Sequence, residues 1–458
     1  MKRTNLTIFA SILSTLLLPT FASASVFLDD NNTNWDAGTL HNMKVYGTGG
    51  NANISSSGNN VSGHFASQVF DSGSDSSNWT NITIRTEIPY GTEIGRAFSD
   101  SSSVSSQDIN DFGFINTSGL ILLMHFNNES SFDEATSEAG LNNKTVDFSV
   151  YVNSERSDSD ANNGSFFGGA TINKTNYKLG GGAVEFDGTD DYIKVSRDGS
   201  LDPGGTNVLT ISAWVKRATS TSKALVAIKR SGGGYVLGVG IVGASTNQIK
   251  MTKYGIADIY LGSFPQDTNW HHLVGVWDGS GTFVYIDGEL DGSNANSQNF
   301  GTSTNGDLLI GGDTGDQGYG EGTIDEVAIW NISLSATEIK NHYKRGALRL
   351  NLSVRSCDDS ACSGDAYQQV SNLSFMGGKI TNLSSGNEGL STNRYFQYNL
   401  TYSRNATGVD GNHTIINNVT IEYNFFSPNP PVFPSLNIFN SAKLTIRKGS
   451  MWRLRWIS

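Results

Sequence analysis

Short apolar runs, each bounded by Gly, Asp, Asn or Ser, recur through the middle of the chain. They are rich in β-branched and aromatic residues, which favour strands, and the residues that flank them are typical of turns. The clearest runs are Leu209–Val215, Leu273–Trp277, Phe283–Ile286 and Ile324–Trp330. Asp287-Gly288 indicates a hairpin, because the tightest hairpin turn needs positive φ at both central residues. The pattern predicts an all-β sandwich.

One helix is predicted, over residues 335–345. Ser335 is placed as its N-cap, and Glu338, three residues later, completes a capping box. Leu334 and Ile339 have the spacing of a hydrophobic staple, and Gly346 is placed to end the helix.

Several motifs follow one another in order between residues 117 and 346. They are Ala183–Ile193, Thr210–Val215, Trp270–Val274, Tyr285–Gly288, Gly322–Trp330 and Leu334–Tyr343. Together they resemble the laminin-G-like (LamG-type) domain with a concanavalin A-like jelly-roll fold. The resemblance covers roughly half of the chain and implies a jelly roll over residues 117–346.

The flanks of this segment resemble a small β-sandwich found in prokaryotic surface proteins. The matching stretches are Gly63–Gly73, Trp79–Ile84, Leu352–Cys357, Asn393–Tyr398 and Asn418–Tyr423. We therefore expect one discontinuous sandwich, 26–115 plus 347–425, with the jelly roll inserted. The predicted helix runs into a strand-like stretch without a flexible linker, as a compact insert with neighbouring termini would. Three consecutive domains are the alternative.

Both ends of the chain differ from its body. Residues 1–24 have a basic start, an apolar stretch and a small-residue cleavage site before Ser25, which predicts a secretory signal peptide rather than a membrane anchor. Proline is concentrated in 427–434, which we interpret as a stiff linker. The tail 435–458 carries basic residues and no acidic one, and we interpret it as a truncated further domain.

The composition narrows the possible partners. Charged residues make up only 16% of the chain, and the formal net charge is -12. A net negative chain repels phosphate backbones, so we expect no nucleic-acid partner. Two cysteines cannot supply the four ligands of a thiolate zinc site. After the signal peptide no apolar run approaches the ~20 residues of a membrane span.

Cys357 and Cys362 are expected to form one short-loop disulfide, because the chain is predicted to enter an oxidising compartment. A redox-active pair would more typically have two intervening residues at a helix start, and here there are four. Asn-x-Ser/Thr sequons are frequent up to Asn173 and again from Asn331, with none between them, which predicts a glycoprotein glycosylated at the surface.

Catalytic patterns were sought and not found, so we expect a protein that is not an enzyme. Laminarinase-type glycosidases with this jelly roll need carboxylates on alternate positions of one strand, but Asp325 has Thr323 and Val327 at those offsets. His271 and His272 are adjacent on a predicted strand, so their rings should point to opposite faces and cannot chelate one metal together.

Calcium is the expected cofactor. Calcium prefers carboxylate and loop carbonyl oxygens, and two loops rich in Gly and Asp offer them, at 187–191 and 313–325. LamG-like domains often hold one calcium ion, and the resemblance implies Asp187 or Asp190 together with Asp325. The alternative is that these carboxylates cap turns and accept backbone N–H bonds.

The sequence therefore predicts a secreted or cell-surface protein that binds glycans or surface proteins through its LamG-like domain. Tyrosines were considered for stacking on sugar rings, namely Tyr235, Tyr254, Tyr260 and Tyr319. Two alternatives stay open: a binding appendage of an extracellular carbohydrate-active hydrolase whose catalytic domain is absent from this chain, and a structural surface-layer component.

Overall fold

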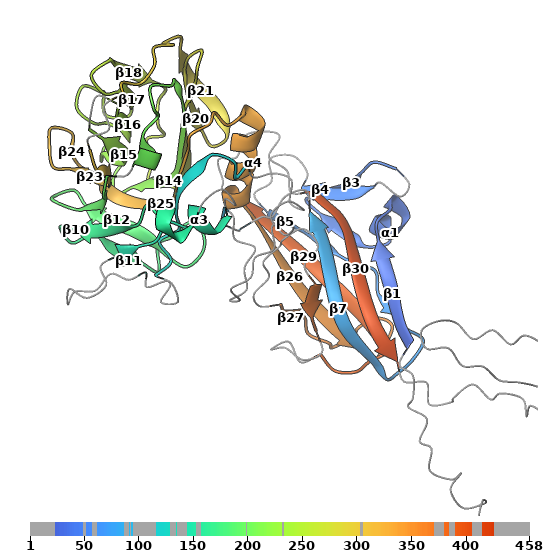
Figure 1. Ribbon diagram of the computed structural model, residues 1–458. Coiled ribbons are helices and arrows are strands. Elements are labelled where there is room, and N and C mark those ends of the chain that lie inside the picture. Colours follow the sequence, from blue (N-terminus) through green and yellow to red (C-terminus); the bar gives the residue numbers. More distant parts are fainter. Residues whose placement is uncertain are drawn as a thin grey trace, which may run out of the picture.

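The computed structural model describes residues 23–48, 52–56, 62–86, 91, 93–94, 116–128, 134, 144–152, 157–197, 199–230, 233–302, 306–370, 380–383, 390–404 and 415–425. Figure 1 shows a rounded lobe and an elongated lobe that meet beside helix α4 (Ala336–Ala347). Except for Ser23 and Ala24, the predicted signal peptide lies outside the described residues, and so do the predicted linker and tail.

The rounded lobe is a sandwich of two antiparallel sheets. One sheet contains β8 (Leu120–Met124), β11 (Thr171–Asn173), β12 (Ala183–Asp187), β14 (Val208–Arg217), β19 (His271–Asp278), β20 (Thr282–Ile286), β21 (Glu289–Asn294) and β25 (Glu321–Trp330). The other contains β9 (Lys144–Thr145), β10 (Gly164–Phe167), β13 (Tyr192–Val195), β15 (Ala224–Lys229), β16 (Tyr235–Val239), β17 (Ile249–Lys253), β18 (Ala257–Leu261) and β22 (Leu308–Ile310). A small ribbon, β23 (Gly312–Asp313) with β24 (Gly318–Tyr319), and the short helices α3 (Ser149–Val152), η3 (Asp158–Asp160) and η4 (Gly199–Leu201) complete the lobe.

The elongated lobe is a second sandwich, and each of its sheets combines strands that precede the jelly roll with strands that follow it. The first sheet contains β1 (Ser23–Asp29), β3 (Met43–Tyr46), β4 (Asn53–Ser56), β7 (Ser77–Thr86), β28 (Ile380–Asn382) and β30 (Ile415–Phe425). The second contains β2 (Thr39–His41), β5 (Ser62–Ala66), β6 (Phe70–Asp71), β26 (Leu348–Cys357), β27 (Gln368–Gln369) and β29 (Tyr395–Arg404). Helix α1 (Asn32–Asp36) follows β1. The predicted all-β fold class, with a jelly roll and a second sandwich, is confirmed.

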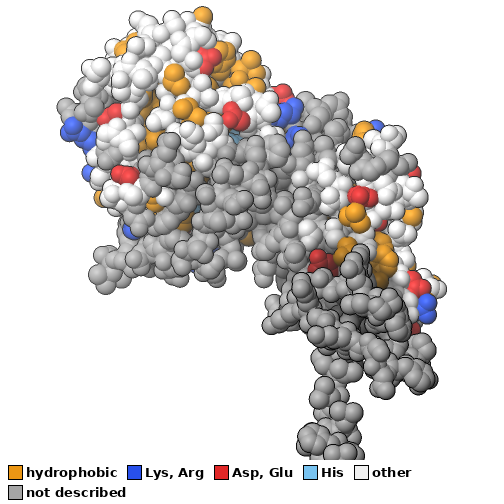
Figure 2. Space-filling view, turned by 45° about the vertical axis from the view of Figure 1, so that its right-hand side comes forward, with side chains coloured by type: hydrophobic (Ala, Val, Ile, Leu, Met, Phe, Trp, Pro, Cys, Tyr) orange, Lys and Arg blue, Asp and Glu red, His pale blue; other side chains and the backbone are white. Residues whose placement is uncertain are grey.

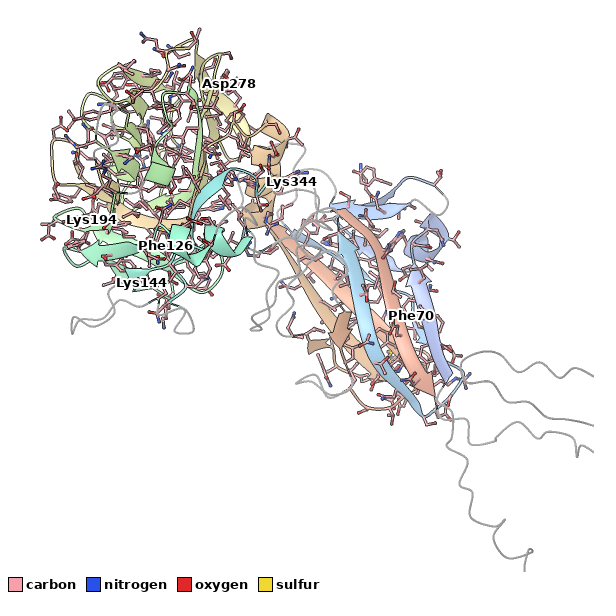
Figure 3. All side chains as sticks on the ribbon, viewed as in Figure 1. Phe70, Phe126, Lys144, Lys194, Asp278 and Lys344 are labelled. Carbon is pink, nitrogen blue, oxygen red and sulfur yellow. A yellow bond between two sulfur atoms is a disulfide. The ribbon has the colours of Figure 1, made fainter. Side chains whose placement is uncertain are left out.

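Each lobe has its own apolar core, and Figure 3 labels one member of each, Phe126 and Phe70. In the elongated lobe Trp79 of β7 stacks on Phe396 of β29, with ring centroids 4.8 Å apart. Because β7 precedes the jelly roll in sequence and β29 follows it, this packing joins the two chain segments that flank the jelly roll. The described surface in Figure 2 is mostly uncharged, with acidic and basic side chains scattered singly, which agrees with the low charged fraction.

The local turn and cap predictions are mostly confirmed. Asp287 and Gly288 have φ of 52° and 80°, as a tight hairpin turn requires. Ser335 caps α4 and forms a capping box with Glu338. The prediction that Gly346 ends this helix is wrong, because α4 continues to Ala347. A Cβ at Gly346 would lie 2.2 Å from the indole ring of Trp214, so the glycine allows the helix to approach the sheet closely.

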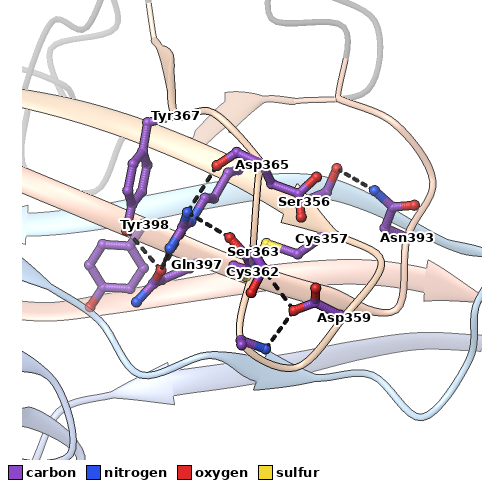
Figure 4. Close-up of a disulfide and its surroundings, with 12 residues drawn as sticks. Ser356, Cys357, Asp359, Cys362, Ser363, Asp365, Tyr367, Asn393, Gln397 and Tyr398 are labelled. Carbon is purple, nitrogen blue, oxygen red and sulfur yellow. Dashed lines mark hydrogen bonds between the residues drawn. A yellow bond between two sulfur atoms is a disulfide. The ribbon is translucent and has the colours of Figure 1, made fainter.

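Cys357 and Cys362 are disulfide-bonded at the end of β26, and Figure 4 shows the loop they close. The backbone N–H groups of Ala361 and Ser363 donate to the Asp359 carboxylate inside this loop. The Arg355 guanidinium donates to the carbonyls of Cys362 and Asp365 and so fixes the loop against the sheet. None of the helices in the described ranges is long and apolar enough to cross a bilayer.

A buried acid in the elongated lobe makes its stability depend on pH. Asp29, at the end of β1, is fully buried, and its Oδ2 accepts a 2.6 Å bond from the hydroxyl of Tyr398. Burial raises the pKa of Asp29 from 3.8 to about 6. The folded state therefore holds this proton more tightly than the unfolded chain does. The stabilisation is complete below about pH 4 and is lost as the pH rises through about 6.

We predict that Asp29 lowers the free energy of unfolding by about 3 kcal/mol between pH 4 and pH 7, since each pKa unit corresponds to about 1.4 kcal/mol. Asp29→Asn should remove this part of the slope in urea titrations across that range. Asp36→Asn removes an exposed carboxylate from helix α1 and serves as the control. An Asp29→Asn protein that keeps the full wild-type slope would contradict the prediction.

Candidate functional site: a rim of the jelly roll

Three loops converge at one rim of the jelly roll. They join β10 to β11, β12 to β13, and β23 to β24. A Cβ at Gly168 in the first loop would lie 2.2 Å from the carbonyl oxygen of Asp190 in the second. A Cβ at Gly312, the first residue of β23 and close to the third loop, would lie 2.3 Å from the carbonyl oxygen of Asp191. Glycine is therefore required at both positions for the loops to touch.

The second loop carries a cluster of three carboxylates, Asp187, Asp190 and Asp191. One oxygen from each lies within 4.8 Å of the others. Asp187 and Asp190 are exposed, whereas Asp191 is only 3% exposed. The backbone N–H of Asp187 donates to Asp191 Oδ2 at 2.8 Å, which holds the Asp191 side chain against the backbone of Asp187. Burial, followed by repulsion from Asp187 and Asp190, raises the pKa of Asp191.

Asp191 Oδ1 is buried and has no hydrogen-bond partner among the described residues. A buried carboxylate oxygen without a donor is costly, and a cation or a ligand hydroxyl at this position would remove that cost. The loop thus offers three hard oxygen ligands, of the kind that calcium prefers.

Two stacked aromatic rings lie directly beside the acidic loop. Phe167, the last residue of β10, pairs with Tyr192, the first residue of β13, and their rings are 4.9 Å apart and inclined by only 7°. Phe167 is 40% exposed, while its neighbour Phe166 faces the core. Lys194, two residues beyond Tyr192 and labelled in Figure 3, marks the outward face of the same strand.

Tyr319 lies next to this pair. A Cβ at Gly312 would lie 2.5 Å from the Tyr319 ring and 3.1 Å from Tyr192 Cβ, so the two tyrosines approach each other across the glycine. Of the tyrosines considered for stacking, only Tyr319 lies at this rim. Tyr235 is fully buried in the core, so its selection as an exposed ring was wrong. Tyr254 stacks near Arg230, and Tyr260 faces Lys250.

Asp325 does not join the acidic loop. Asp187 pairs with Glu321, and Asp325 lies four residues further along β25, about 13 Å away at the usual rise per residue. Its Oδ2 accepts N–H bonds from Lys178 (2.8 Å) and Leu179 (3.0 Å), and its Oδ1 accepts one from Glu326. The backbone-bonded alternative therefore describes Asp325, and the structure brings Asp187 and Asp190 together with Asp191 instead.

A β-bulge explains where Asp325 points. The register between β14 and β25 shifts at Ser212/Trp214, and Glu326 has φ of 52°. The bulge breaks the alternation that would have placed Asp325 on the same face as Val327 and Ile329, which line the core. Asp325 and Glu326 are 0% and 2% exposed, so this carboxylate pair is not open to a sugar.

The two adjacent histidines have separate partners, as the alternation predicts. The ring of His271 bonds to Asp287 and Asp267, and that of His272 bonds to Ser212 Oγ at 2.8 Å. Complete burial lowers the pKa of His272 to about 3. These rings therefore hold the sandwich together and are not part of the rim.

Comparisons with known proteins agree with this fold. Residues 187–340 match the family model of the concanavalin A-like lectin/glucanases superfamily of laminin G type. Among curated proteins the comparison found no match.

Several solved structures match part of this chain at low similarity. Domain 4 of an extracellular arabinanase from Geobacillus stearothermophilus, in complex with arabinotriose, is 18% identical over 49% of this chain and 98% of that chain, with a TM-score of 0.35. The receptor-binding domain of a botulinum neurotoxin mosaic serotype C/D is 14% identical over 50% of this chain and 51% of that chain, with a TM-score of 0.36. The binding domain of Paraclostridial Mosquitocidal Protein 1 is 13% identical over 59% and 69%, with a TM-score of 0.36.

Identities and TM-scores this low carry no inference about what the present chain binds. The family match and the observed strand order carry the assignment. The rounded lobe of this chain therefore has a concanavalin A-like jelly-roll fold, within which residues 187–340 match the laminin G-type model of the lectin/glucanase superfamily.

Proposed function

We propose that this chain is a secreted or cell-surface binding protein, without catalytic activity of its own, that recognises a glycan at the rim of its jelly roll. The observation that carries the proposal is the stacked pair of the exposed Phe167 and the half-buried Tyr192, beside the carboxylates of the 187–191 loop. A flat aromatic face suits the C–H face of a sugar ring. Carboxylates accept hydrogen bonds from sugar hydroxyls.

The position of the rim supports this role. In Figure 1, β10, β23 and β24 lie on the side of the rounded lobe away from α4, where the second lobe is attached. The rim is therefore open to a ligand when the elongated lobe is held by a cell surface or by another domain. Secretion itself rests on the composition of residues 1–24, and the disulfide is compatible with an oxidising compartment.

We further propose that one calcium ion binds at Asp187, Asp190 and Asp191. Asp191 Oδ1 supports this site because it is buried beside two exposed carboxylates and has no donor among the described residues. The ion would neutralise the repulsion within the loop and hold the loop beside the aromatic pair.

Phe167→Ala should weaken glycan binding about fivefold, because one aromatic–sugar stacking contact contributes on the order of 1 kcal/mol. A glycan array would identify the ligand, and calorimetry would give the two affinities. Tyr46→Ala is the matched control, because Tyr46 is similarly exposed on the other lobe. Equal affinities of Phe167→Ala and wild type, or binding to a surface protein with no glycan bound, would contradict the proposal.

Calcium at one hundred times its Kd should add about 2.7 kcal/mol of stability, which raises the Tm of a domain this size by about 5 to 10 °C. Asp190→Asn should abolish this shift in differential scanning calorimetry. Asp325→Asn should lower the Tm and keep the shift, because its backbone bonds are unrelated to the ion. A shift that is lost in Asp325→Asn and kept in Asp190→Asn would restore the original ligand set.

A further inference from the structure

A second group of metal-ligating side chains lies buried where the two lobes meet. Glu93 belongs to the segment between β7 and β8, His125 directly follows β8, and Glu326 forms the bulge in β25. All three are almost fully buried, and one ligand atom from each lies within 4.8 Å of the others. His125 Nδ1 is 2.5 Å from Glu326 Oε1 and 3.8 Å from Glu93 Oε1.

Neighbouring groups hold each of these side chains in place. The backbone N–H of Ile94 donates to Glu326 Oε2 at 3.1 Å, and the Asn127 amide donates to Glu93 Oε1. The imidazole of His125 packs against the ring of Phe148, with centroids 4.8 Å apart. Ligands oriented by an outer layer of hydrogen bonds and packing are characteristic of metal sites.

Negative charge is concentrated around these ligands. Glu134 and Asp325 are buried nearby. Arg345 donates to the carbonyl oxygen of Glu93 and partly balances this charge. A divalent cation between Glu93, His125 and Glu326 would stabilise the carboxylates in their charged form.

We propose that Glu93, His125 and Glu326 bind one divalent transition-metal ion, with Zn²⁺ as the preferred ion, and that this ion fastens the segment entering the jelly roll to the jelly roll itself. One imidazole and two carboxylates form a ligand set common to zinc and manganese, whereas calcium takes oxygen ligands only. The small number of cysteines excludes only thiolate zinc sites. This site is separate from the rim, so it does not depend on the proposed glycan function.

The full chain, purified without a histidine tag and dialysed against EDTA, should take up one equivalent of Zn²⁺ in equilibrium dialysis with elemental analysis. Its Tm should rise with Zn²⁺ by an amount that added calcium does not reproduce. Glu93→Gln, which keeps the side-chain shape, and His125→Ala should each weaken Zn²⁺ binding about tenfold or more. Cobalt(II) loaded in place of zinc should show visible absorption that both variants lose.

Two matched variants make this test specific. His64→Ala removes an imidazole from the His41–His64 stack on the other lobe and should leave Zn²⁺ binding unchanged. Asp190→Asn should abolish the calcium response and retain the zinc response. Absence of stoichiometric zinc from the folded wild type, loss of zinc in His64→Ala, or full zinc binding in Glu93→Gln would each overturn the proposal. If His125→Ala does not fold, Glu93→Gln and the wild-type dialysis still decide the question.

Discussion

The structure depends on the neck, the region where the chain passes from the elongated sandwich into the jelly roll and back again. The backbone N–H of Gly91, on the entering segment, donates to the carbonyl oxygen of Arg345, on the leaving helix, at 2.6 Å. Where the chain leaves the jelly roll, helix α4 ends at Ala347 and β26 begins at Leu348, so no linker residue separates the lobes at this connection. Arg349 of β26 donates back to the carbonyls of Gly346 and Lys178, which belong to the jelly-roll lobe. Helix, strand and entering segment therefore share one set of hydrogen bonds.

This neck constrains the sequences around it. Lys178 is buried over the Trp214 ring, and burial lowers its pKa to about 7. Position 346 has room only for glycine, because helix α4 packs directly against the same indole ring. The bulge at Glu326 turns Asp325 and Glu326 toward the neck and leaves Val327 and Ile329 in the core. Polar groups thus gather where the lobes join, and the rim with its acidic loop lies on the side of the jelly roll away from α4 (Figure 1).

Much of the fold could be predicted because its signals are local. The capping box at Ser335, the turn at Asp287-Gly288 and the strand around Trp214 depend on residues close in sequence. The site could be predicted only in part. Asp187 and Asp190 lie on the loop that the Gly/Asp pattern indicates, but Asp325, which the LamG resemblance implied as a ligand, accepts backbone N–H bonds beside the bulge at Glu326. Nothing in the sequence indicates that position 326 adopts positive φ.

Other contacts could not be predicted because they join distant residues. Phe167 and Tyr192 stack because β10 pairs with β13. The sequence pattern around these two residues does not distinguish them from the aromatic residues of the core. Glu93 meets Glu326 across more than two hundred residues. The one available signal was His125, a titratable residue directly after the apolar strand Leu120–Met124. For Tyr235 the prediction failed in the opposite direction. This tyrosine was predicted to be exposed, but it is buried in the core.

The central claim is that the neck holds the two lobes in one orientation, so that the rim faces away from the sandwich. Spin labels on cysteines introduced at Ser62 of β5 and Ser165 of β10, both exposed, would measure this by electron–electron double resonance. If the neck holds the lobes in one orientation, the full chain should give a single narrow distance distribution. A broad or multi-peaked distribution would show that the lobes move independently and would contradict it.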